Sequence, residues 1–176
     1  MKRYHPFLVA LHWILAALVV GGLIMGGQVL AKLPNDSADK LFSLRMHMSV
    51  GMVIGVLMLV RLVTRLRTRH PAPADTGNAL LNLGGRVAHW ALYALVLLMV
   101  GSGIGISLSA GLPDIVFGDS GAPLPADFSV FPPRVAHGIL SKLLALTILA
   151  HVAGWLYHQY VLKDGLFGRM WFGKRD

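Results

Sequence analysis

The side chains of this sequence that could carry chemistry are its eight histidines, because the chain has no cysteine. Imidazole is the commonest metal ligand among protein side chains, and it binds in its neutral form. Six of the eight lie within or at the ends of long apolar stretches: His12, His47, His89, His137, His151 and His158. An ionisable group inside a membrane span is costly and is usually functional. These six are therefore candidate ligands, whereas His5 and His70 lie in polar flanks and are expected to be solvated.

The histidines lie on four stretches that are each long enough to cross a membrane as a helix. The stretches cover about residues 7–31, 44–63, 87–109 and 135–162. The hydrocarbon core of a bilayer requires about 20 mostly apolar residues, and these runs lack the alternation typical of barrel strands. Charged residues make up only 14% of the 176 residues, against about 25% in a soluble domain. We expect an all-α integral membrane protein, a single four-helix bundle domain over residues 1–176.

The basic residues predict how this bundle is oriented. Eleven of the sixteen lysines and arginines lie in the amino-terminal segment, between the second and third stretches, or in the carboxy-terminal tail. Only four lie on the opposite side of the four stretches. Since cytoplasmic loops carry the excess of Lys and Arg, both termini are expected to face the cytoplasm. The net charge of +8 is then explained by topology, and no nucleic-acid partner is expected.

Helix geometry places the candidate ligands at two depths in the membrane. His137 and His151 are 14 residues apart, so they share a helix face within about 40° and are separated by about 21 Å along the axis. Depth alone pairs His137 with His47 near the outer surface, and His151 with His12 near the inner surface. His89 also lies at the inner depth, where it could replace His12 as a ligand or serve a substrate.

Two stacked pairs of neutral imidazoles suit two b-type haems, whose flat apolar rings fit between helices with the iron bound axially from both sides. The four histidines would then be the ligands of two haem irons. His158 follows His151 by seven residues on nearly the same face, and is either an interface residue or a quinone-binding one. Lys142 lies inside the fourth stretch, where it either extends to the membrane surface or pairs with a haem propionate or an anionic substrate.

The sequence resembles the bacterial cytochrome b561 family of four-helix, di-haem membrane proteins. The motifs that carry the resemblance are His12-Trp13, Met46-His47-Met48 leading into a stretch that ends Leu59-Val60-Arg61-Leu62, Ala88-His89-Trp90, the pair His137 and His151, and His158 followed by Lys163-Asp164. The resemblance implies a multi-pass protein of the bacterial inner membrane that contacts lipid and binds two haem b groups. His12, His47, His137 and His151 would be the axial ligands, and His158 would lie near a ubiquinone.

The same resemblance predicts a function, because one member of the family is a superoxide oxidase. We expect electrons to pass from a periplasmic donor, superoxide, through the two haems to ubiquinone, which is the activity of a superoxide:ubiquinone oxidoreductase. Arg45, Arg134 and Lys142 lie on or near the outer side and could attract a small anionic donor such as superoxide. The outer loops nevertheless carry five aspartates against four basic residues, which limits this attraction.

Two alternatives use the same histidines differently. The first is a haem b membrane-anchor subunit that transfers electrons for a separate dehydrogenase or hydrogenase, which would act as a redox partner subunit. The second is a transporter of divalent metals. A transport site usually combines histidine with carboxylates, and all eight aspartates lie outside the predicted spans.

Overall fold

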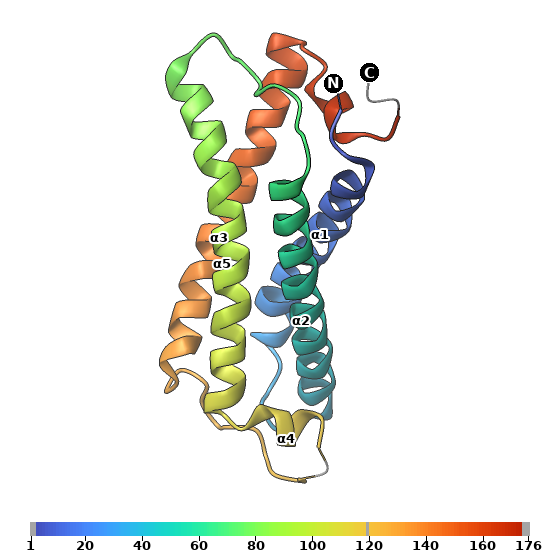
Figure 1. The fold of residues 1–176 in the computed structure, drawn as a ribbon. Helices are drawn as coiled ribbons and strands as arrows, with labels where there is room; N and C mark the ends of the chain where they lie inside the picture. Colours follow the sequence, from blue (N-terminus) through green and yellow to red (C-terminus); the bar gives the residue numbers. More distant parts are fainter. Residues whose placement is uncertain (1–2, 119, 174–176) are drawn as a thin grey trace.

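The structure is a computed structural model that describes residues 3–118 and 120–173, all helices and connecting segments (Figure 1). The elements are α1 (Pro6–Ile24) with its π-helical continuation η1 (Met25–Leu30), α2 (Ala38–Arg67), α3 (Ala79–Ser109), α4 (Leu112–Val116), α5 (Pro132–Leu156) with its π-helical continuation η2 (Tyr157–Leu162), and the 3₁₀ helix η3 (Leu166–Met170). Four of these segments are long and apolar enough to cross a membrane. The predicted all-α membrane bundle is therefore confirmed. Lys2, Lys174 and Arg175, which entered the orientation argument, and Asp119 lie outside the described residues.

The second and third spans are longer than the sequence predicted. The second begins at Ala38 instead of residue 44, and the third at Ala79 instead of residue 87. Both helices start at a capping side chain: Ser37 Oγ accepts a hydrogen bond from Lys40 N–H, and Asn78 Oδ1 accepts one from Leu80 N–H. Such caps satisfy the free N–H groups of a first turn. The helices start earlier than predicted because the prediction followed the long apolar runs and ignored these capping side chains.

Inside the bundle, α5 faces α1 and α2 across a boundary that we call the seam. α5 packs along α3, α1 packs along α2, and α2 packs against α3, while α5 makes only sparse backbone contact with α1 and α2 (Figure 1). Both chain ends lie at the same end of the bundle, where Arg3 approaches Gly173, and α4 lies at the other. We call these the termini end and the α4 end. The candidate ligands of α1, α2 and α5 meet across the seam.

Apolar side chains fill the middle of the bundle, between the two depths at which the histidines lie. The central cluster consists of Leu15, Ile54, Met58, Tyr93, Val96 and Leu144. A second cluster, around Ile106, Leu112 and Val116, fixes α4 against the bundle, and Arg45 Nε donates a 2.8 Å hydrogen bond to Val116 O. The outward faces are apolar as well, with Leu98 and Leu149 more than half exposed. A large apolar exterior indicates a lipid-facing surface.

Candidate functional site

At the α4 end, His47 of α2 and His137 of α5 lie side by side. Their ring centres are 6.2 Å apart and their planes cross at 75°. Two glycines lie against them: an added Cβ would be 3.4 Å from His47 Cε1 at Gly26, and 3.5 Å from His137 Cε1 at Gly103. Any side chain longer than alanine at these positions would enter the space beside the rings. The glycines of η1 and α3 therefore keep a cradle open around this pair.

Ser102 is a residue of this site that the sequence analysis missed. Its Oγ lies 2.9 Å from His137 Nδ1 and 2.9 Å from Met99 O. The hydroxyl has a single proton, which it donates to the Met99 carbonyl, so it accepts a hydrogen bond from His137 Nδ1–H. That leaves Nε2 of His137 with its lone pair, the state that a metal ligand requires. Serine is too common in membrane helices for its sequence position alone to have signalled this role.

At the termini end, three histidines from three helices approach one another. His151 of α5 lies between His12 of α1, at 6.3 Å between ring centres, and His89 of α3, at 5.1 Å. Arg61 of α2 lies close enough to interact electrostatically with all three. Its guanidinium donates a hydrogen bond to Leu8 O and lies over the Tyr93 ring. In the sequence, Arg61 was counted among the basic residues that orient the bundle and within a family motif, but its position at this site was not predicted.

The spacing of the rings can be compared with the spacing that one iron held by two imidazoles would require. Two imidazoles on opposite sides of one metal, each with a metal–nitrogen bond of about 2 Å, have ring centres about 6 Å apart. The pairs His47–His137 and His12–His151 match this spacing, at 6.2 and 6.3 Å. The spacing of His89 and His151, at 5.1 Å, is too short for one iron.

Within residues 3–118 and 120–173, no group of three or more histidine or acidic side chains is placed to hold a metal ion.

His158 lies apart from these clusters, beyond His151 toward the termini end. Its Nδ1 is 2.6 Å from Asp164 Oδ2. Two other polar atoms on the same segment are buried and have no hydrogen-bond partner among the described residues, Trp155 Nε1 and Gln159 Oε1. A buried polar atom without a partner is costly and is rare in folded proteins. The end of α5 and η2 therefore offers one donor and one acceptor to a polar ligand.

The remaining predicted residues lie outside these sites. Lys142 is exposed on α5 and has no hydrogen-bond or ion-pair partner in the described part of the chain, which favours the interpretation as a side chain that extends along the lipid-facing surface. His5 is not merely solvated, because its Nδ1 caps α1 by accepting a hydrogen bond from Phe7 N–H. His70 contacts the Tyr4 ring, and partial burial lowers the pKa of its imidazole.

Fold and site together define a class: a four-helix membrane protein whose interior holds histidine pairs at two depths. Residues 3–173 match the family described as "Prokaryotic cytochrome b561", and the chain belongs to that family. It is 28% identical to cytochrome b561 homolog 2 of Escherichia coli K12, over 96% of this chain and 91% of that protein. It is 27% identical to a protein of Yersinia pestis named "Probable superoxide oxidase CybB", over 99% of this chain and 98% of that protein.

Membership of this family fixes the general activity. The chain is a multi-pass bacterial membrane protein that binds haem b and takes part in membrane electron transfer. The resemblance inferred from the histidine motifs is thereby confirmed. The identity of the axial ligands stays a prediction, supported by the ring spacings described above.

Proposed function

We propose that this protein carries electrons across the bacterial inner membrane from superoxide to ubiquinone, by way of two haem b groups. The observation that carries the proposal is the matched geometry of two histidine pairs, 6.2 and 6.3 Å between ring centres. The two pairs are about 21 Å apart along α5, with the apolar central cluster between them. With both termini in the cytoplasm, the α4 end faces the periplasm.

Each pair has its own supporting side chains. His47 and His137 would hold one haem at the α4 end, and Ser102 orients the His137 ring. His12 and His151 would hold the other at the termini end, where the charge of Arg61 suits an anionic haem carboxylate. When bound, the haems supply one-electron redox chemistry. The protein determines where the two groups lie and how strongly each holds its electron.

The α4 end has cationic groups for an anionic donor. Arg134 lies in the first turn of α5, where a Cβ added at Gly138 would be 3.3 Å from its guanidinium. Arg45 donates a hydrogen bond to Val116 O at the end of α4. Positive charge near a redox site raises the local concentration of an anion. Two superoxide anions each give up one electron and leave as dioxygen. One ubiquinone takes up the two electrons and two protons to become ubiquinol.

The termini end has polar groups for the acceptor. The buried Trp155 Nε1–H can donate a hydrogen bond to a quinone carbonyl, and Gln159 Oε1 can accept one from a quinol hydroxyl. Both follow His151 within eight residues, which supports an acceptor site next to the inner pair. His158 lies on the same segment and is the nearby group that can release a proton.

The deciding experiment is spectroscopic. Purified protein is expected to show b-type haem absorption with two haems per chain, reduced by enzymatically generated superoxide and reoxidised by a soluble ubiquinone analogue. Zero haem would refute the proposal. Haem that superoxide does not reduce, together with co-purification of a large redox enzyme, would favour the membrane-anchor subunit instead.

A further inference from the structure

His158 and Asp164 form a short side-chain contact at the termini end of the bundle. His158 Nδ1 lies 2.6 Å from Asp164 Oδ2. The other carboxylate oxygen, Oδ1, accepts a hydrogen bond from Leu166 N–H at 3.0 Å. A turn through Lys163 and Gly165, both with positive φ, brings Asp164 back against His158. The carboxylate is therefore fixed in place by the backbone.

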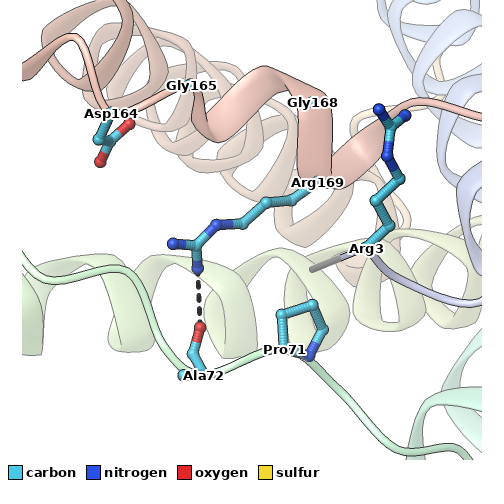
Figure 2. Close-up of a pocket in the computed structure, with 7 residues that line it drawn as sticks. All are labelled: Arg3, Pro71, Ala72, Asp164, Gly165, Gly168 and Arg169. Atoms are coloured by element: carbon cyan, nitrogen blue, oxygen red, sulfur yellow. Dashed lines mark hydrogen bonds between the residues drawn. The ribbon is translucent and has the colours of Figure 1, made fainter. Parts of the chain in front are cut away.

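Asp164 also forms part of the wall of a pocket that opens at the termini end. The pocket has a volume of about 410 Å³ and is lined by Arg3, Pro71, Ala72, Asp164, Gly165, Gly168 and Arg169 (Figure 2). Arg169 crosses it and donates a hydrogen bond to Ala72 O at 2.8 Å, with Asp164 on one side and Arg3 on the other. The volume is enough for several water molecules. Asp164 therefore borders both this polar pocket and His158.

The two side chains differ in exposure in the way that a path from water to the interior requires. The side chain of Asp164 is 27% exposed, and that of His158 is 12% exposed. Partial burial opposes the charge of Asp164, but the hydrogen bonds from His158 and Leu166 N–H, with Arg169 nearby, hold the pKa of its carboxyl below its usual range. An ionised carboxylate can only accept hydrogen bonds. His158 Nδ1 is consequently the donor, and Nε2 is the atom left for another partner.

We propose that Asp164 and His158 form a proton-transfer pair that connects the pocket to the acceptor site at the end of α5. The proposal rests on the proposed reduction of a quinone at this end. Asp164 is a positioning residue: it holds the His158 ring and stabilises the positive charge that the ring carries when protonated. His158 passes the Nε2 proton to an oxygen of the reduced quinone and becomes neutral. A proton from water that reaches the ring past Asp164 then returns to Nε2, and two such cycles supply the two protons of one quinol.

The charged and titratable groups around the pair come from four segments. They are Arg3 before α1, His70 next to the pocket residue Pro71, Tyr157 and Lys163 on the segment of His158 itself, and Arg169 on η3. Asp164 is the acidic side chain among them. Removing its charge therefore leaves His158 among cations, which disfavours protonation of the ring.

The experiment compares Asp164→Asn with Asp75→Asn in the haem-loaded protein. Asp75 is a matched control, because its Oδ1 also accepts a hydrogen bond from the N–H two residues later, at Gly77, and it lies at the same end of the bundle. Reoxidation of the haem by decylubiquinone is followed per bound haem from pH 5.5 to 8.5. Asp164→Asn is expected to slow it by about tenfold at pH 8, with little effect at pH 5.5, and Asp164→Glu to restore the wild-type profile.

A second readout does not depend on turnover. Diethylpyrocarbonate modifies neutral imidazole, so its reaction with His158, measured by mass spectrometry, is expected to extend to lower pH in Asp164→Asn than in Asp75→Asn. Equal pH profiles and equal labelling in these two variants would overturn the proposal, as would absence of His158 labelling at every pH. If the wild-type haem is reduced by superoxide but not reoxidised by the quinone, the proposed acceptor is wrong, while the labelling comparison still decides whether Asp164 governs His158.

Discussion

The hydrogen bond from His137 to Ser102 predicts a measurable property of the haem at the α4 end. Ser102 Oγ accepts from His137 Nδ1–H at 2.9 Å while it donates to Met99 O. A hydrogen bond at the distal nitrogen makes an imidazole a more basic ligand, which stabilises the oxidised iron. Ser102→Ala removes this bond without adding bulk. The reduced haem becomes relatively more stable, so the midpoint potential is expected to rise.

The size of the shift follows from the strength of one hydrogen bond. A net contribution of about 0.5–1.5 kcal/mol, expressed wholly in one oxidation state, corresponds to about 20–65 mV for a one-electron couple. A potentiometric titration that follows the haem absorption bands measures both haems in the same sample. The expected result is an upward shift of one haem within this range, with the other unchanged.

Ser141→Ala is the matched control for this titration. Ser141 Oγ donates to the carbonyl three residues earlier, Gly138 O, at 2.8 Å, as Ser102 does to Met99 O. In the described residues it has no hydrogen bond to a histidine. A shift of similar size in Ser141→Ala, or no shift in Ser102→Ala, would refute the assignment of Ser102 as the residue that orients His137.

Three further predictions concern the termini end and the lipid-facing surface. His12→Ala is expected to lower the haem content from two to one per chain, whereas His89→Ala is expected to keep both haems. The reason is that only the spacing of His12 and His151 suits one iron. The reverse result in a pyridine haemochromogen assay would make His89 the ligand. Gln159→Leu is expected to raise the KM for a ubiquinone analogue about three- to tenfold, which is the effect of one lost hydrogen bond. An unchanged KM would show that Gln159 is not part of the acceptor site. Lys142→Gln is expected to leave haem content and superoxide-driven haem reduction unchanged, since this side chain is exposed and has no partner among the described residues. Loss of either would assign Lys142 a role in the site.

The fold was predictable because its main signals are local in sequence. A run of about 20 apolar residues specifies a membrane helix by itself, and the spans at the two ends of the chain were predicted to within a few residues. The starts of α2 and α3 were not, since they depend on the caps Ser37 and Asn78. These caps are visible in the sequence, but a hydropathy scan does not weigh them. The π-helical ends η1 and η2 have no comparable local signal.

Sequence alone also determined which histidines lie at which depth, because rise per residue converts spacing into height along a helix. It could not determine which rings face one another across the bundle, since that depends on helix rotation and on packing between segments far apart in the chain. Only the tertiary structure distinguished the 6.3 Å spacing of His12 from the 5.1 Å spacing of His89, both relative to His151. It alone brought Ser102 to His137 and folded Asp164 back onto His158. These contacts depend on directions of side chains in three dimensions, which the order of residues does not specify.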